Sequence, residues 1–265
     1  MQTQRYPEGL IDSREEGVCT LTIDRAADEN RLSPELIARL GALAEALRED
    51  REVNVVVLTG AGSEIFSLGI LNPKIRASFT KDDIVQLVRR ANAVFDAIEA
   101  LPQLVIAAIN GKVLAGASEL CLAADLRYAA ASATLAMPEA TWGGFPGAGA
   151  PVRLPLLVGR ARALELICSG RQIDAAEMER FGLAQGVFPQ ERFREAVAAL
   201  ARKIAGNGPL AVRGAKRIAA LRQEPGFREA RELSDALRSA LEWSRDVDEG
   251  LAAHRENRKP KFTGR

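Results

Sequence analysis

Two short runs of uncharged, largely β-branched residues limit the folds that this chain can adopt. They cover residues 53–58 (VNVVVL) and 104–109 (LVIAAI). Neither run alternates polar and apolar residues as a half-exposed strand does, so each predicts a buried strand. Thr80, with Asp83 as its capping partner, predicts a helix between them that ends before Pro102. This strand–helix–strand order predicts an α/β core.

The flanking segments extend the pattern in both directions. Residues 18–23 alternate as a strand does. Ser33 followed by Pro34 marks the start of a helix that carries leucines at helical spacing along one face. Beyond about residue 188 the strand pattern stops, and three further prolines each open a helical pattern. We therefore predict an α/β core over residues 1–205 and a helical C-terminal module over residues 206–265.

The charge of the chain is almost balanced. The sequence has 36 Lys and Arg against 35 Asp and Glu, which gives a formal net charge of +1. This balance argues against a nucleic acid or an anionic membrane as the main partner. The longest apolar run, residues 104–109, is far shorter than the ~20 residues that cross a bilayer. The polar N-terminal segment also lacks the apolar region of a secretion signal.

Histidine and cysteine are scarce and scattered. His254 is the only histidine, and the three cysteines, Cys19, Cys121 and Cys168, are far apart in the sequence. No pair of them has the spacing of a metal site, and three scattered cysteines give no disulfide framework. We therefore predict a cytoplasmic protein without a metal, in which Cys121 and Cys168 are small core residues.

Three glycine-containing segments resemble known motifs but fail at a decisive position. Gly60-Ala-Gly62 has Ile65 where a dinucleotide loop has its third glycine. The glycines of residues 143–149 follow no good strand, and the Lys-Ser/Thr pair of a P-loop is missing. Residues 116–120 begin as a nucleophile elbow, but the last glycine is absent and no sequence feature brings His254 near Ser118.

Carboxylates therefore remain as the natural acid–base groups. Glu119 is the only charged residue between Val113 and Ala124, and Glu139 is the only one between residues 135 and 142. Apolar surroundings disfavour the charged form of a carboxylate and raise its pKa. The same surroundings fit a structural glutamate bonded to backbone amides or to an arginine. The residues alone leave both interpretations open.

Backbone N–H groups complete the candidate site. The small residues Gly116 and Ala117 precede a predicted helix, where free N–H groups can face a developing negative charge. The turn over residues 66–70 offers a second such N–H.

Four segments in order resemble the crotonase, or enoyl-CoA hydratase/isomerase, superfamily. They are residues 55–60 with 66–69, residues 106–111 with 116–120, residues 138–149, and residues 249–262. The resemblance covers nearly the whole chain and implies a spiral of ββα units with a trailing helical module. It also implies a homotrimer or a dimer of trimers, and no cofactor other than the coenzyme A carried by the substrate.

The resemblance also implies roles for individual residues. The backbone N–H groups of Ile70 and Gly116 would form an oxyanion hole, and Glu119 and Glu139 would flank a water molecule. The expected substrate-binding residues are Leu68, Gly69, Leu71, Ala115, Trp142 and Gly143. Having both glutamates favours an enoyl-CoA hydratase-like lyase. The alternatives are an enoyl-CoA isomerase, a C–C bond hydrolase, or a non-catalytic acyl-CoA-binding subunit.

The chain departs from the family pattern at several positions. Leu68-Gly69-Ile70-Leu71 stands where Ala-Gly-x-Asp is usual, and Ala115-Gly116-Ala117 replaces a run of three glycines. These changes predict an altered pocket wall beside the thioester. The usual coenzyme A contacts are also changed, at Ala27, Asp28, Glu29, His254 and Asn257. Asp28 and Glu29 would repel the phosphates of coenzyme A. The basic residues that could bind these phosphates instead are Lys74, Arg76, Arg255 and Arg258. The identity of the carrier therefore stays open.

Overall fold

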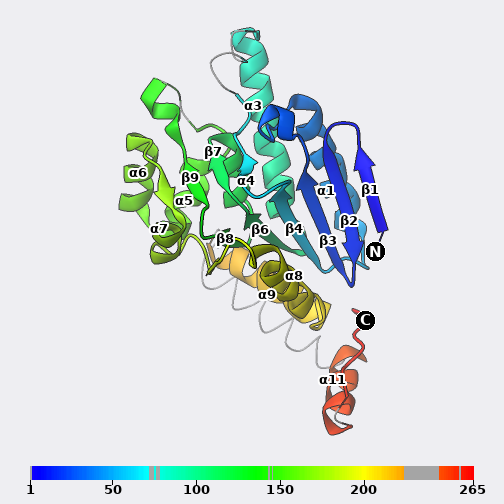
Figure 1. Ribbon diagram of the computed structural model, residues 1–265. Coiled ribbons are helices and arrows are strands. Elements are labelled where there is room, and N and C mark those ends of the chain that lie inside the picture. Colours follow the sequence, from blue (N-terminus) through cyan, green and yellow to red (C-terminus); the bar gives the residue numbers. More distant parts are fainter. Residues whose placement is uncertain are drawn as a thin grey trace.

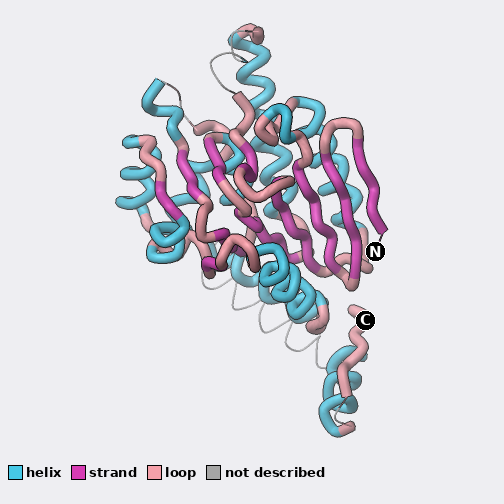
Figure 2. The backbone as a smooth tube through the Cα atoms, viewed as in Figure 1, coloured by secondary structure: helices cyan, strands magenta, loops and turns pink. Residues whose placement is uncertain are grey.

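The computed structural model describes every residue except 1, 72–74, 76–77, 143, 145, 224–244 and 257. Its strands form two sheets (Figures 1 and 2). The larger sheet has the order β1-β2-β3-β4-β6-β8-β11. In chain order these strands are β1 (Gln2–Tyr6), β2 (Leu10–Glu15), β3 (Val18–Ile23), β4 (Val55–Gly60), β6 (Leu104–Ile109), β8 (Leu126–Ala130) and β11 (Val187–Phe188). The first three are antiparallel, and from β3 to β11 all neighbours are parallel.

The smaller sheet has the order β10-β9-β7-β5. Its strands are β5 (Ile65–Ser67), β7 (Lys112–Leu114), β9 (Thr134–Ala136) and β10 (Ile173–Asp174). β5 and β7 each follow a strand of the larger sheet, β4 and β6, after a short connection. Pairs of strands from the two sheets therefore alternate with helices, as the predicted ββα spiral requires.

Helices cover both faces of the larger sheet (Figure 1). α1 (Pro34–Glu49) packs against α3 (Lys81–Glu99) on one face, and α8 (Phe193–Ala205) contacts β3, β4, β6 and β8 from the other. The remaining described helices are α4 (Gly116–Leu122), α5 (Ala150–Val158), α6 (Arg160–Ser169), α7 (Ala175–Arg180), α9 (Pro209–Gln223) and α11 (Arg245–Arg255), with 3₁₀ turns η1 (Ala26–Asp28) and η2 (Pro138–Trp142). None of the helices within the described ranges is both long and apolar enough to cross a membrane.

The strongest sequence signals correspond to the central elements. β3 and β6 have the predicted bounds, whereas β4 begins two residues later than predicted and runs to Gly60, because Thr59 and Gly60 still pair with β3. The Ser33 hydroxyl accepts the Leu36 N–H at 3.3 Å and starts α1 as predicted. α3 begins with the predicted capping box, in which the Thr80 hydroxyl accepts the Asp83 N–H at 3.1 Å.

The described C-terminal part contains the helices α9 and α11 and a non-helical tail over residues 258–265, and no described strand follows β11. α9 is tied to the larger sheet, because the Lys216 ammonium contacts Asp125 at 2.7 Å and donates to the Gln103 carbonyl at 2.9 Å. The helix expected after Pro225 lies outside the described residues. The boundary between residues 205 and 206 therefore stays a prediction.

Candidate active site

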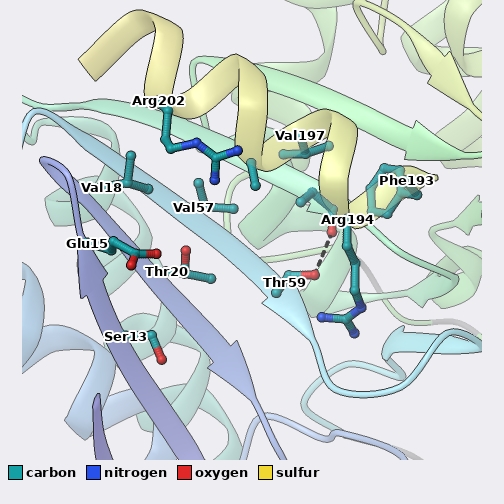
Figure 3. Close-up of a pocket in the computed structure, with 12 residues that line it drawn as sticks. Ser13, Glu15, Val18, Thr20, Val57, Thr59, Phe193, Arg194, Val197 and Arg202 are labelled. Carbon is teal, nitrogen blue, oxygen red and sulfur yellow. Dashed lines mark hydrogen bonds between the residues drawn. The ribbon is translucent and has the colours of Figure 1, made fainter. Parts of the chain in front are cut away.

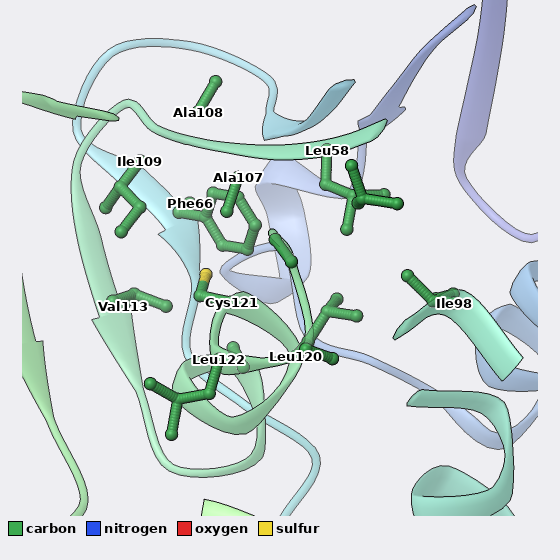
Figure 4. Close-up of a cluster of buried hydrophobic side chains, with 14 of the residues drawn as sticks. Leu58, Phe66, Ile98, Ala107, Ala108, Ile109, Val113, Leu120, Cys121 and Leu122 are labelled. Carbon is green, nitrogen blue, oxygen red and sulfur yellow. The ribbon is translucent and has the colours of Figure 1, made fainter. Parts of the chain in front are cut away.

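The helix α4 lies in the hydrophobic core and packs against β7 and α5. All seven of its residues are buried. Leu120, Cys121 and Leu122 lie among core side chains of β4, β6 and α3 (Figure 4), which include Leu58, Ala107 and Ile98. This packing anchors the C-terminal half of the helix. Its N-terminal residues, Gly116 to Glu119, are therefore held at the end of β7, next to β5.

The turn before α4 has an unusual backbone conformation. Ala115 has φ 53° and ψ −129°, which an L-residue rarely adopts. Its N–H donates to the carbonyl of Ala136 in β9 at 2.9 Å. The resulting sharp reversal carries the chain directly from β7 into α4. It places the Gly116 N–H at the free N-terminal end of the helix.

The segment after β5 lies against this turn. Gly69 has φ +83°, and a β-carbon there would lie 2.8 Å from the Leu114 carbonyl and 3.3 Å from the Gly116 nitrogen. The Ile70 side chain covers Gly116, where an added β-carbon would lie 2.7 Å from Ile70 Cδ1. Gly69 is thus required by its backbone conformation and by close approach, and Ile70 packs directly on Gly116. The structure brings together the two backbone segments that the resemblance assigns to the oxyanion hole.

Of the remaining predicted pocket residues, the structure describes Leu68 and Leu71 in full, but not Trp142 and Gly143. Leu68 is fixed by its backbone, which donates to the Glu29 carbonyl at 3.2 Å and accepts from Arg31 at 2.7 Å. Leu71 is partly buried and packs against the core. Trp142 ends η2, but its side chain and the whole of Gly143 lie outside the described residues.

Glu119 is a buried acid. The residue is only 2% exposed, and its Oε1 accepts the Ala150 N–H at 3.0 Å. The pKa of Glu119 is raised to about 7, mainly by burial and also by the negative charge of Glu139. The backbone groups of Ala150 and Ala148 and the charge of Arg153 act in the opposite direction. Within the described residues Glu119 forms no ion pair. It can therefore gain or lose a proton near neutral pH.

Glu139 lies in η2 and faces the same region. It is half-buried, and its Oε2 has no hydrogen-bond partner among the described residues. Burial raises the pKa of this carboxyl as well. Its main-chain carbonyl accepts the Gly144 N–H at 2.8 Å. The two glutamates, which are far apart in the sequence, are thus close enough for the charge of one to change the pKa of the other.

Two contributors to this site were missed by the sequence analysis. The Ala150 N–H depends on the geometry of the turn before α5, which no residue pattern indicates. Arg153 is the only charged residue in α5 (APVRLPLLV). An isolated charge in an apolar stretch is the signal that singled out Glu119, and it identifies Arg153 equally well.

The acids expected to repel phosphates have partners of their own. Asp28 pairs with Arg25 at 2.8 Å and Glu29 pairs with Arg31 at 2.7 Å. Their charge is therefore offset locally, which the sequence analysis did not foresee. Among the proposed substitutes, Arg258 is engaged by Glu249 at 2.6 Å and by Glu256 at 2.5 Å. Lys74, Arg76 and Asn257, and the side chains of His254 and Arg255, lie outside the described residues.

A separate hollow of about 250 Å³ lies on the opposite face of the larger sheet (Figure 3). It is lined by residues of α8 and of the strands β2, β3, β4 and β6, among them Val57, Phe193 and Arg194. The Thr59 hydroxyl on its wall donates to the Ala108 carbonyl at 3.0 Å. None of the predicted site residues lines this hollow. In the part of the chain that the structure describes, no three metal-ligating side chains lie together either.

Comparisons with known proteins extend over nearly the whole chain. The family described as enoyl-CoA hydratase/isomerase matches residues 13–265. The chain is 33% identical to the mitochondrial methylglutaconyl-CoA hydratase of Rattus norvegicus over 259 residues, which are 96% of this chain and 82% of that protein. It is also 33% identical to the 2,3-dehydroadipyl-CoA hydratase of Escherichia coli over 260 residues, 97% and 99% of the two chains. A solved enoyl-CoA hydratase from Bacillus anthracis superposes with a TM-score of 0.93 at 36% identity, covering 97% of this chain and 100% of that one.

Proposed function

The chain belongs to the enoyl-CoA hydratase/isomerase family, and on that premise we propose that it adds water across the Cα=Cβ bond of an acyl-CoA thioester. Its relatives support a hydratase-like activity in general. The specific proposal is that Glu119 and Glu139 carry out the proton transfers and that the N–H groups of Ile70 and Gly116 bind the thioester oxygen.

One observation carries this proposal. Two carboxyl groups with raised pKa values lie close together, and neither is neutralised by an ion pair within the described residues. Glu139 also keeps an oxygen without a hydrogen-bond partner there. A purely structural glutamate would have its carboxylate oxygens satisfied by amides or by an arginine. Glu119 has one such amide, from Ala150, which orients the carboxyl and leaves it able to exchange a proton.

The reaction follows from this arrangement. One glutamate removes a proton from water while the water oxygen forms a bond to Cβ. The electron pair of the Cα=Cβ bond moves toward the thioester and forms an enolate, whose oxygen is stabilised by the two N–H groups. Cα then takes a proton from the other glutamate, so that one water is added overall. Because close carboxylates titrate as a pair, the two roles are not divided between them.

We propose that bulky side chains shape the pocket wall beside the thioester, where Leu68 and Leu71 depart from the family pattern. Ile70 lies over Gly116 and is nearly buried, so its side chain adds bulk beside the proposed oxyanion hole. The acyl-CoA substrate, the assembly as a homotrimer or dimer of trimers, and the cytoplasmic compartment remain predictions.

A panel of enoyl-CoA esters tests the proposal. The assay follows loss of the conjugated chromophore and identifies products by mass. We expect a 3-hydroxyacyl-CoA product, heavier than the substrate by one water. A shifted double bond would support an isomerase, a cleaved chain would support a C–C hydrolase, and binding without turnover would support an acyl-CoA-binding subunit. Each of these three results would overturn hydration.

A further inference from the structure

A second buried charge lies behind Glu119, on α5. The Arg153 side chain is only 6% exposed. A buried guanidinium is costly unless partners neutralise it and satisfy its N–H groups. The contacts of Arg153 therefore show which parts of the molecule it holds together.

On one side Arg153 contacts the C-terminal end of α3. Its Nε donates to Glu99 Oε2 at 2.8 Å, and its Nη2 donates to Asp96 Oδ1. These carboxylates are 51% and 63% exposed, so they sit at the surface while the guanidinium is inside. The two acids together offset the positive charge of Arg153.

On its other side Arg153 holds the turn before α5. Its Nη1 donates to the Ala148 carbonyl at 3.2 Å, and its backbone N–H donates to the Gly149 carbonyl at 3.0 Å. Gly149 has φ +118°, and a β-carbon there would lie 1.9 Å from Nη1, so only glycine fits. The next residue, Ala150, donates its N–H to Glu119 at 3.0 Å.

We propose that Arg153 is a positioning residue for Glu119: it fixes the 148–150 turn that binds the carboxylate, and its charge, balanced by Asp96 and Glu99, stabilises the ionised form. The link from α3 through Arg153 to Glu119 is a property of the folded chain. Its consequence for catalysis rests on the proposed function.

The charges around Glu119 predict whether its pKa rises or falls in each variant. Glu139 of η2 raises the pKa of Glu119, and Arg153 of α5 lowers it. Replacing Arg153 with Gln removes the cation and leaves Asp96 and Glu99 unopposed, so the pKa of Glu119 should rise. Replacing both acids, as D96N/E99Q, leaves the cation unopposed, so the pKa should fall. A residue that only filled space would not produce opposite shifts.

The test is a titration of Glu119 in the ligand-free protein. Glutamate labelled with ¹³C at the carboxyl carbon is followed by NMR, and the Glu119 signal is assigned by its absence from E119Q. We expect an upward shift of about one pH unit in R153Q, as for an opposite charge at short range, and a downward shift in D96N/E99Q. Equal values in wild type and D96N/E99Q, or shifts of the same sign in both variants, would overturn the proposal.

Arg171 provides a matched control. It also bridges two carboxylates, Glu165 at 2.6 Å and Glu177 at 3.1 Å, but it is exposed and contacts neither α4 nor α5 in the described residues. R171Q should leave the titration of Glu119 unchanged. Should R153Q fail to fold, D96N/E99Q still decides the matter, because both acids are at the surface.

The kinetic readout separates the two proposals. In R153Q we expect the acidic limb of the kcat/KM profile to move to higher pH, with kcat reduced and KM little changed. If the wild-type enzyme hydrates no enoyl-CoA, the proposed function fails while the NMR titration still tests Arg153. If hydration occurs and the titration shows no shift, only the Arg153 proposal fails.

Discussion

Two buried carboxylates, Asp12 on β2 and Glu119 on α4, are equally hidden from solvent but differently partnered. Asp12 is 3% exposed, and its oxygens accept three hydrogen bonds from Arg14, at 3.1, 3.0 and 2.9 Å, with a fourth from the Cys19 thiol at 3.3 Å. Glu119 is 2% exposed and accepts one N–H from Ala150, with another acid, Glu139, close by.

This difference shows that burial alone does not make an acid reactive. A carboxylate in direct contact with a guanidinium has its charge balanced by that ion pair and contributes to stability. One that is buried beside a like charge carries an unfavourable charge near neutral pH, and its proton becomes exchangeable there. The first arrangement lies on β2, and through Arg14 it connects this strand to Asp50 after α1. The second, at the end of β7, is the one that we propose takes part in proton transfer.

The largest expected effect is on turnover at the second site. E119Q and E139Q keep the shape of each side chain and remove its proton transfer. Hydration of an enoyl-CoA should therefore fall by at least ~10²-fold in each variant, the lower end for acid–base catalysis. Initial rates from loss of the conjugated chromophore measure this. Near-normal turnover in either variant would remove that glutamate from the mechanism.

The matching change at the first site should affect stability instead. D12N removes the charge that Arg14 binds, so the free energy of unfolding should fall by about 2 kcal/mol, the usual value for hydrogen bonds to a charged group. Urea unfolding measures this, and turnover of the folded variant should stay within about twofold of wild type. A large loss of turnover without a loss of stability would break the distinction between the two acids.

A smaller effect is expected from the turn that begins α4. Ala115, at φ 53° and ψ −129°, stores backbone strain of about 1–3 kcal/mol, which A115G would release. Glycine also loses about 0.4–1 kcal/mol through greater freedom of the unfolded chain. We expect a net gain of about 1 kcal/mol in urea unfolding. A117G, inside the same helix, should instead lose about 1 kcal/mol, and a loss in both variants would contradict the strain.

The sequence predicts the central elements because their signals are long and uniform. The crotonase-like α/β fold, β3, β6 and the N-termini of α1 and α3 are confirmed. The strands β1 and β2 were not predicted from the sequence. β1 is an exposed edge strand of mainly polar residues. In β2 the buried position of Asp12 interrupts the apolar pattern, because the pairing with Arg14 is visible only in three dimensions.

Other features of the structure leave no recognisable pattern in the sequence. β5, β7, β9 and β10 have only two or three residues each, too few to show a periodicity. Cys121 is buried as predicted, but the prediction for Cys168 is wrong, because it lies on the exposed side of α6. Both glutamates were identified by their apolar neighbours. Their proximity, and the turn that delivers the Ala150 N–H, follow from the folded backbone.

The pH dependence of stability tests most directly whether Glu119 is buried without an ion-pair partner. Its pKa is about 7 in the folded protein against an ordinary value of 4.5, so the folded state binds its proton more tightly than the unfolded state does. The stability from this proton is present below about pH 4.5 and lost as the pH rises through about 7. As the pH rises from about 4.5 to about 7, the free energy of unfolding of E119Q should therefore increase by about 3 kcal/mol relative to wild type, measured by urea unfolding. A difference between the two proteins that does not change with pH would contradict the account.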